Sequence, residues 1–205
     1  MEQRTDEWFA ARLGHVGCSR LGDVLATGKG GAPSATRKNY MAELVCERLT
    51  GQKAEHFTSK IMDRASDIEL LARSAYEAKR GVLVEEHGGQ ECKSIPDWWA
   101  SPDGLIGTEG GLEIKCPNTA THLDTLLNKK IDTYYLYQMA GNCFIYDRQW
   151  WDFVSYDPRL PENLSIFICR FQRNELPIDL VKNGVLQFVE ELKILMEQLK
   201  GIAND

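Results

Sequence analysis

The residues with the clearest chemical use lie between Ser101 and Pro117, in the segment SPDGLIGTEGGLEIKCP. Its last part, GLEIKCP, is predicted to be a strand, and alternate side chains of a strand share one face, so Glu113 and Lys115 point the same way. Asp103 lies in a Ser-Pro-Asp-Gly turn ten residues before Glu113. A hairpin of that length can fold the turn back beside the strand, so we expect two carboxylates and one amine to converge. The intervening side chains are expected to face a core: Leu112, Ile114 and Cys116.

This set of groups suits a divalent metal ion. The two carboxylates and the main-chain carbonyl of Ile114 supply only oxygen ligands, which Mg²⁺ prefers and Mn²⁺ accepts. A metal ion there lowers the pKa of its bound water and neutralises charge on a phosphate, while Lys115 can orient or deprotonate the attacking water. Phosphodiester hydrolysis is the natural reaction of such a site. A D…E-x-K pattern also occurs by chance among solvated surface charges, so the flanking sequence has to separate the two interpretations.

The flanking motifs resemble the phage lambda-type exonucleases, the YqaJ-like viral recombinase family within the PD-(D/E)XK nucleases. SPDG followed by GLEIKCP matches that family closely. The resemblance extends from RLGHVGCS near the N-terminus, through DIELLARSAYE, to YDPR after the second helix-strand unit. Four blocks in the family's order therefore cover most of the chain. The resemblance implies an α/β fold with a restriction-endonuclease-like mixed β-sheet core flanked by helices.

The resemblance also assigns two further residues to the chemistry. Glu69, in DIELLARSAYE, matches a metal-site acid of the family, although Arg73 one turn later makes an ordinary surface pair the alternative. Gln138, in YYLYQMAGN, matches the first glutamine of the family's Q-x-Q helix, which helps position the water or the scissile phosphate. Ala140 replaces the second glutamine, so any role of that residue is lost. The alternative for Gln138 is a structural amide on a helix.

Binding of DNA is assigned to basic residues in the first third of the chain. Arg12 and Ser19, in RLGHVGCS, resemble the segment that holds the terminal 5′-phosphate, and the glycines beside them let a backbone approach an anion. Lys29 and Lys60 fall where the family makes basic DNA contacts. The alternative for Arg12 is a surface pair with an acidic residue at position 6 or 7, and the alternative for the lysines is solvation.

Composition places limits on the class of protein. A length of 205 residues with 43% hydrophobic and 26% charged residues describes one globular domain, so residues 1–205 are predicted to be a single exonuclease domain. No apolar run or signal segment directs the chain to a membrane, so a cytoplasmic protein encoded by a bacterium or a prophage is expected. The six cysteines are widely spaced without a C-x-x-C pair, which argues against zinc or iron-sulfur sites and favours reduced thiols. The four histidines have no metal-ligand spacing and are assigned no role.

The net charge of −6 requires DNA binding to be local. Residues 1–60 contain nine Lys/Arg and seven Asp/Glu, a balance of +2, while the remaining 15 Lys/Arg and 23 Asp/Glu give −8. An acidic exterior with a basic groove would keep phosphate contacts at the place of the chemistry. Two adjacent tryptophan pairs, Trp98-Trp99 and Trp150-Trp151, are each expected to direct one ring outward or into an interface.

Periodicity and capping residues predict the order of elements. Thr5 is expected to cap a short helix, Ser19 to cap another through Ala26, and Ser34 to begin one that ends near Gly51. The other predicted helices are 59–80, 121–128, 133–146 and 177–200, and on the third of these Tyr135, Gln138 and Asn142 share a face. The predicted strands are 82–86, 91–94, 98–101, the strand of Glu113, 150–156 and 164–171. This order agrees with the core that the resemblance implies.

The resulting prediction is a Mg²⁺-dependent 5′-to-3′ exonuclease that digests one strand of double-stranded DNA to mononucleotides and leaves a 3′ overhang for strand annealing. Direction, product, preference for a 5′-phosphate end, a homotrimeric ring and a partner that anneals single strands are implied by the resemblance alone. Two alternatives remain open. One is a structure-specific or restriction-type endonuclease on the same core, and the other is a DNA-binding module with a vestigial nuclease site.

Overall fold

A four-stranded mixed sheet carries the strand predicted to hold the chemistry. The computed structural model describes residues 3–53 and 60–204, and the side chains of all of these except 60–67 and 203–204. The sheet has the order β4-β5-β6-β7, in which β5 and β6 run parallel and the two outer pairs run antiparallel. The strands are β4 (Gly104–Ile106), β5 (Gly110–Lys115), β6 (Trp150–Tyr156) and β7 (Ile166–Gln172).

A smaller sheet of three short strands, in the order β1-β3-β2, lies near the N-terminal helices. Its strands are β1 (Val16–Gly17), β2 (Gln90–Glu91) and β3 (Trp98–Ala100). Strand β1 runs parallel to β3, and β2 runs antiparallel to it. The smaller sheet therefore joins the segment of Arg12 and Ser19 to the chain just before Asp103.

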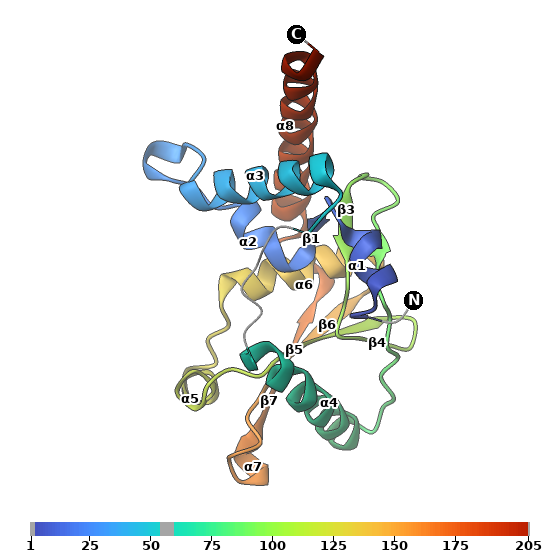
Figure 1. The fold of residues 1–205 in the computed structure, drawn as a ribbon. Coiled ribbons are helices and arrows are strands. Elements are labelled where there is room, and N and C mark those ends of the chain that lie inside the picture. The colour runs from blue at the N-terminus through green and yellow to red at the C-terminus, as the bar shows by residue number, and fades with distance from the viewer. Residues whose placement is uncertain (1–2, 54–59, 205) are drawn as a thin grey trace.

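Two helices cover opposite faces of the larger sheet (Figure 1). These helices are α4 (Lys60–Arg80) and α6 (Thr133–Ile145). The face towards α4 forms one apolar cluster, which includes Ala72, Tyr76, Leu112, Ile114 and Val154. The face towards α6 contributes to the larger core, which includes Met139, Ala140, Trp151 and Phe153. The expected α/β core, with a mixed sheet between helices, is confirmed.

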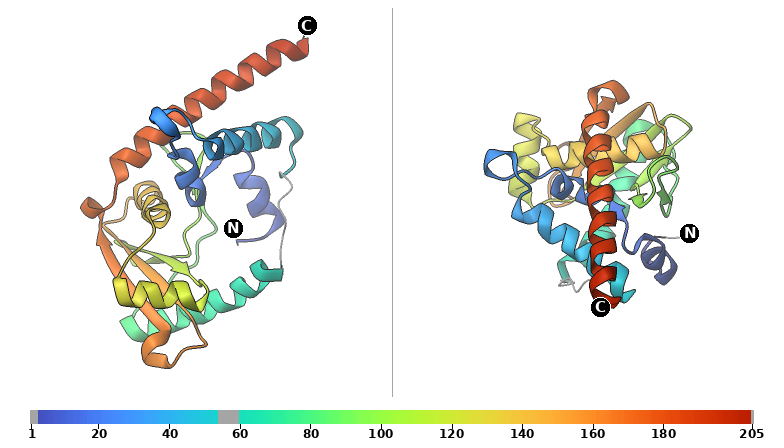
Figure 2. Two further views of the ribbon diagram at one scale, coloured as in Figure 1. Left: turned by 90° about the vertical axis from the view of Figure 1, so that its left-hand side faces the viewer. Right: turned by 90° about the horizontal axis from the view of Figure 1, so that it is seen from above.

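The remaining elements surround this core. They are α1 (Asp6–Arg12), η1 (Cys18–Arg20), α2 (Leu21–Val24), η2 (Lys29–Gly31), α3 (Ala35–Thr50), α5 (Thr119–Asn128), α7 (Glu162–Ser165), η3 (Arg173–Glu175) and α8 (Ile178–Asn204). The first half of α8 packs on the core through Val181, Val185 and Phe188, and its end extends away from the body (Figure 2). None of the helices in the described residues combines the length and the apolar character needed to cross a membrane.

Three of the predicted helix boundaries are correct because they depend on local capping. Thr5 Oγ1 accepts a hydrogen bond from the main-chain N–H of Trp8 at 3.3 Å, and Ser34 Oγ accepts one from Arg37 at 3.1 Å. Each side chain satisfies a main-chain donor that the first turn of a helix leaves free. Gly51 ends α3 with a φ of 66°, the left-handed conformation that favours glycine.

The predicted cap at Ser19 is wrong. Ser19 lies inside the 3-10 helix η1, so its own backbone is already helical, and the turn begins at Gly17. The short helix α2 then starts after Arg20, which provides no side-chain cap. A capping residue is recognised by an extended backbone before the helix, and Ser19 lacks that conformation.

The predicted strand over 82–86 is also wrong. In this segment only Glu85 pairs, in an isolated bridge in which it exchanges both main-chain hydrogen bonds with Leu105. Val84 instead packs on Gly104, and its N–H donates to the carboxylate of Glu77 at 2.7 Å.

Other predicted boundaries shift. Only Glu91 of the predicted strand over 91–94 lies in a strand, β2. Helix α5 begins at Thr119 behind the cap of Asn118, α7 precedes β7, and α8 continues past residue 200. The predicted start at Ser59 lies outside the described residues.

The tryptophan pairs differ from the expectation in one case. Trp98 and Trp99 are both buried, because β3 is covered on both of its faces. The ring of Trp98 stacks on Phe144 with centroids 5.6 Å apart, and the ring of Trp99 meets His15 edge-on at 5.9 Å. Trp151 is buried as well, whereas Trp150 is half-buried.

Candidate active site

Strand β5 places an acid and an amine side by side. Glu113 and Lys115 lie on the same face of the strand, as alternation predicts, and Lys115 Nζ is 2.6 Å from Glu113 Oε1. Glu113 has no exposed surface, whereas the lysine side chain is 24% exposed. The amine therefore lies between a buried carboxylate and the surface of the protein.

Asp103 is held beside this strand by the hairpin. The register pairs Gly104 with Leu112, which places the residue before Gly104 next to Glu113. Asp103 Oδ2 also accepts a hydrogen bond from the main-chain N–H of Ile114 at 2.6 Å. The structure thus brings together the three residues Asp103, Glu113 and Lys115, as the spacing predicts.

Helix α6 covers the polar face of β5 with three side chains that the sequence places on one helix face. Gln138 Oε1 accepts a hydrogen bond from Lys115 Nζ at 3.2 Å. The same ammonium lies 4.9 Å from the centre of the Tyr135 ring, in cation-π geometry. Asn142 Nδ2 is 3.4 Å from Glu113 Oε2, a long contact. Gln138 therefore holds the ammonium group of Lys115. The carboxylate of Glu113 receives only a weak contact from the amide of Asn142.

Glu69 approaches the site from α4, with two arginines as partners. Arg4 Nη2 donates to Glu69 Oε2 at 2.9 Å, and Arg73 Nη2 lies 3.8 Å from Glu69 Oε1. The helical pair of Glu69 and Arg73 that was the alternative interpretation is therefore present, but it is long. Arg73 also makes a close ion pair with Glu86. Sequence reasoning missed Arg4, because a single arginine outside the recognised blocks carries no local signal.

The carboxylates influence one another's ionisation. Burial and the charge of Glu113 raise the pKa of Asp103 to about 7. Burial also raises the pKa of Glu69, with Asp103 as the next cause. The pKa of Glu113 is raised by burial, against the opposing charge of Lys115. Burial lowers the pKa of Lys115, but the charges of Glu113 and Asp103 outweigh this effect and hold that pKa above its ordinary value. The three carboxyl groups thus oppose one another's ionisation. A site of this kind attracts a cation, because a positive charge lets the carboxylates ionise together.

By chemical type the carboxylates of the site suit a divalent metal ion, although in this structure the oxygens of Glu69, Asp103 and Glu113 are not gathered within 4.8 Å of one another. Glu113 Oε1 is buried and, apart from its ion pair with Lys115, has no hydrogen bond of good geometry. A buried carboxylate oxygen without such a bond is costly unless a proton or a cation occupies its free side. Oxygen ligands of Glu69, Asp103 and Glu113 match the preference of Mg²⁺ and Mn²⁺.

A cavity of about 180 Å³ joins this site to the residues expected to bind phosphate. Its lining includes residues of both groups, Arg12 and Ser19 on one hand and Asp103 and Gln138 on the other, together with the polar side chains of Gln3, Arg4 and Ser101. Arg12 and Ser19 stand on either side of Gly17, since a methyl group there would lie 3.6 Å from Arg12 Nη2 and 3.8 Å from Ser19 Oγ. One opening therefore holds cationic and hydroxyl groups beside the carboxylate of Asp103.

Arg12 is placed by stacking on an aromatic ring. Its guanidinium lies over the ring of Trp8, 4.3 Å from the centroid. In the described part of the chain Arg12 has no ion pair with Asp6 or Glu7, so the alternative of a surface pair is not what the structure contains. Burial lowers the pKa of Arg12, with the nearby Tyr40 opposing that change. A partly desolvated guanidinium in a cavity is suited to an anion.

Of the two lysines expected to contact DNA, Lys29 is not among the lining residues. Lys29 is exposed in η2, where the following glycines have φ values of 72° and 81°. Lys60 begins α4, and its side chain lies outside the described residues.

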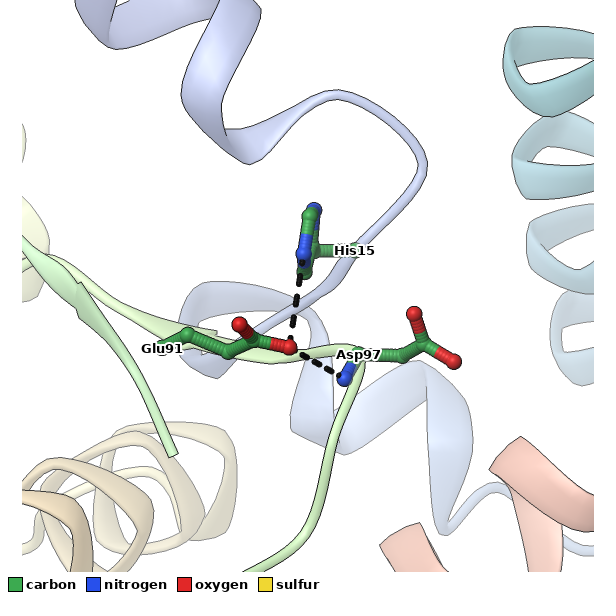
Figure 3. Close-up of side chains that lie close together, drawn as sticks. All are labelled: His15, Glu91 and Asp97. Atoms are coloured by element: carbon green, nitrogen blue, oxygen red, sulfur yellow. Dashed lines mark hydrogen bonds and ion pairs between the residues drawn. The ribbon is translucent and has the colours of Figure 1, made fainter. Parts of the chain in front are cut away.

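A separate group of potential metal ligands, whose ligand atoms lie closer together, is found apart from the residues that line this cavity (Figure 3). His15, Glu91 and Asp97 place one ligand atom each within 4.8 Å of one another, and no other such group is found in the described residues. His15 Nε2 is 3.6 Å from Glu91 Oε1, which also accepts the main-chain N–H of Asp97 at 2.8 Å. Asp97 is already paired with Arg48 at 3.1 Å. His15 is more than 70 residues from Glu91 and Asp97 in the sequence, so spacing gave no signal for this cluster.

Fold and site together define a nuclease core of the restriction-endonuclease-like class. Residues 7–149, well over half of the chain, match the family model described as the YqaJ-like viral recombinase domain. The chain belongs to this family, and the resemblance drawn from its four sequence blocks is confirmed.

Solved structures agree with this assignment. LHK-Exo, an alkaline exonuclease from Laribacter hongkongensis, is 42% identical to the chain over 98% of both chains, with a TM-score of 0.88. A crystal structure of LHK-Exo in complex with dAMP gives the same identity and coverage with a TM-score of 0.90. A phage-related exonuclease from Haemophilus somnus 129PT shares the fold at 20% identity, with a TM-score of 0.71 over 90% of this chain and 96% of that one. No curated protein gives a significant sequence match.

Proposed function

We propose that this chain, an exonuclease of the YqaJ-like family, is a Mg²⁺-dependent 5′-to-3′ exonuclease on double-stranded DNA. It digests one strand to mononucleotides and leaves a 3′ single-stranded overhang for recombination by strand annealing. The observation that supports this function best is the single cavity that joins Arg12 and Ser19 to Asp103 and Gln138. A site for a terminal phosphate beside a hydrolytic site is what an enzyme that works from an end requires.

Glu69, Asp103, Glu113 and the carbonyl of Ile114 are the groups that would hold the metal, with Mn²⁺ as a substitute for Mg²⁺. A divalent ion supplies Lewis acidity towards the phosphate and a more acidic water. Lys115 is proposed to orient the attacking water and not to deprotonate it. In the metal-free protein its neighbouring carboxylates hold the pKa above the ordinary value, which favours the charged amine, a donor of hydrogen bonds. Gln138 fixes the direction of that ammonium through its 3.2 Å hydrogen bond.

Arg12 and Ser19 are proposed to read the 5′-phosphate and so to set the direction. A terminal monoester carries close to two charges at neutral pH and offers three oxygens, against one charge for an internal diester. The guanidinium can hold two oxygens and the hydroxyl one. Attack of water on the next phosphorus breaks its bond to the 3′ oxygen of the end nucleotide. The released product is a 5′-mononucleotide, and the new end again bears a 5′-phosphate for the next cycle.

Several further properties are proposed on the basis of the family. A structure of LHK-Exo contains dAMP, a deoxynucleoside monophosphate of the kind proposed here as product. Lys29 and Lys60 would contact the duplex. Residues 1–205 would act as one exonuclease domain, assemble as a homotrimer around DNA, and work with a single-strand annealing protein. The enzyme would meet its DNA in the bacterial cytoplasm, where the six free cysteines would remain reduced.

A comparison of substrates tests the function. End-labelled linear duplex with 5′-phosphate or 5′-hydroxyl ends, and covalently closed circular duplex, are incubated with Mg²⁺ or EDTA. We expect mononucleotides only with Mg²⁺, faster from 5′-phosphate ends, and intact circles. Cleavage of closed circles would indicate an endonuclease, and binding without any metal-dependent product would indicate a module with a vestigial site.

The metal site has its own test. Mg²⁺ or Mn²⁺ should raise the melting temperature of the wild type, because an ion that binds the folded state stabilises it. Asp103→Ala and Glu113→Ala should lose that increase. If both variants keep the full increase, the metal is bound elsewhere, and the cluster of His15, Glu91 and Asp97 becomes the next site to test.

A further inference from the structure

Arg4 contacts both parts of the site, the carboxylates expected to bind a metal cation and the cavity expected to bind a phosphate anion. Its guanidinium donates to Glu69 at 2.9 Å, yet 52% of its side chain stays exposed, against 21% for the glutamate. The same side chain lines the cavity that Arg12 and Ser19 enter. Arg4 can therefore neutralise a carboxylate expected to bind metal, and it is also within the space where a phosphate is expected.

The backbone around Arg4 is held at both ends. The side-chain amide of Gln3 donates to the carbonyl oxygens of His87 at 2.9 Å and Pro102 at 2.8 Å. Thr5 on the other side caps α1. Between these anchors Arg4 has a φ of 68°, a left-handed conformation that residues with a Cβ seldom adopt. Such a conformation persists only where the surroundings impose it, and its occurrence at a charged site favours a role for the side chain.

Two other cations near the carboxylates, Lys115 and Arg73, each have a closer partner than Glu69. Lys115 is paired with Glu113 at 2.6 Å. Arg73 reaches Glu69 only at 3.8 Å and makes a closer ion pair with Glu86. Among the described residues Arg4 is thus the nearest cation of Glu69, and its exposure leaves it free to turn. A divalent ion that binds the oxygens of Glu69 would repel the guanidinium, because two cations would then share one carboxylate.

We propose that Arg4 exchanges partners when the site is loaded. Without metal it neutralises Glu69, and once a divalent ion binds Glu69 it turns into the cavity and binds the 5′-phosphate together with Arg12. The identity of the anion as a DNA phosphate rests on the proposed function. The exchange makes metal and phosphorylated DNA ends bind cooperatively, because each removes a competitor of the other.

The substitution Arg4→Gln gives two effects of opposite sign. In a calorimetric titration with Mn²⁺ in the absence of DNA, its affinity for the ion should be about two- to fivefold tighter, the range expected for removing a half-exposed ion pair. With Ca²⁺ in place of Mg²⁺ to limit turnover, its affinity for a 5′-phosphorylated duplex, measured by fluorescence anisotropy, should be weaker. Affinity for the 5′-hydroxyl duplex should not change. A gel checks that the duplex stays intact.

Two controls isolate the contact. Arg12→Gln removes the same charge from the same cavity, but Arg12 makes no ion pair with Glu69 in the described residues, so its Mn²⁺ affinity should stay near the wild-type value. In a Glu69→Gln background, Arg4→Gln should no longer change Mn²⁺ affinity. Together these variants separate the direct contact between Arg4 and Glu69 from a general change in the electrostatic potential of the cavity.

The proposal is overturned if Arg4→Gln leaves the Mn²⁺ affinity unchanged or weakens it, or if binding of the phosphorylated duplex is unchanged. Loss of both affinities together would mean that the substitution damages the structure, which also excludes an exchange. Neither measurement uses turnover. Failure of the proposed nuclease function would instead appear as wild-type protein without metal-dependent hydrolysis.

Discussion

Replacing Lys115 by methionine removes the counter-charge of a fully buried carboxylate. The two charged atoms are 2.6 Å apart, and Glu113 has no exposed surface. Their Coulomb attraction is about 6 kcal/mol at an effective dielectric constant near 20. Both groups lose hydration on burial and the lysine side chain keeps 24% of its surface exposed, so the net effect is smaller. We expect the free energy of unfolding of the metal-free protein at pH 8 to fall by about 3 kcal/mol.

The size of this loss should depend on protons and on metal. Burial raises the pKa of Glu113 and the charge of Lys115 opposes that rise, so without the lysine the carboxyl takes up a proton at a higher pH. The loss should therefore be smaller at pH 5.5, where a neutral Glu113 needs no counter-charge. Saturating Mg²⁺ at pH 8 should also reduce it. Urea denaturation followed by circular dichroism, in EDTA and in Mg²⁺, measures all of these values.

The matched control is Lys200→Met. Lys200 pairs with Glu197 at 3.3 Å on the exposed end of α8, and this surface pair should contribute less than about 1 kcal/mol under every condition. A Lys115→Met loss that is equal at both pH values and unaffected by Mg²⁺ would refute the electrostatic argument and leave packing as the cause. Hydrolysis by the same variant should fall by roughly 10² or more while DNA binding persists. Wild-type turnover would make the lysine purely structural.

Three other expectations follow from single positions. Arg12→Ala should slow digestion of 5′-phosphorylated duplex and leave 5′-hydroxyl duplex unaffected, and an unchanged preference would sink the phosphate assignment. Gly141→Ala puts a methyl group 2.6 Å from Leu21 Cδ1, so urea denaturation should show a loss of about 1–3 kcal/mol, whereas Gly201→Ala, with open space around it, should show none. Burial and a neighbouring carboxylate raise the pKa of Asp103 to about 7, so its ionisation opposes folding as pH rises from about 4 to 7. In EDTA, Asp103→Asn should flatten the corresponding fall in melting temperature, and an unchanged slope would contradict that pKa.

The parts of the site that follow from local rules could be predicted from the sequence. Alternation along a strand placed Glu113 and Lys115 on one face, and helical spacing placed Gln138 and Asn142 on the face that meets them. The turn before β4 similarly brought Asp103 back to the strand. In each case one element of regular structure fixes the relative direction of the side chains, whatever the rest of the chain does.

The parts that depend on distant partners could not be predicted. Arg4 reaches Glu69 because Gln3 binds loops more than 80 residues away, and no local pattern encodes such contacts. The segment over 82–86 was predicted to be a strand, but it pairs through Glu85 alone, with Leu105 some twenty residues later. The cluster of His15, Glu91 and Asp97 likewise exists only after β1, β2 and β3 have come together.

The anchoring of the N-terminal segment also bears on how the protein is made. Val16 pairs with Trp98, Trp8 donates its indole N–H to the carbonyl of Gly88, and Gln3 binds Pro102, so these early residues wait for partners about 80 to 100 positions later. At ribosomal rates that wait is about 5–20 s. Until then α1 is a short isolated helix, and Trp8 lacks the partners that bury it. Chaperones and proteases can recognise such a state. The lining of the cavity is complete only after Gln138 has left the ribosome. Incomplete chains therefore have no assembled site with which to attack DNA.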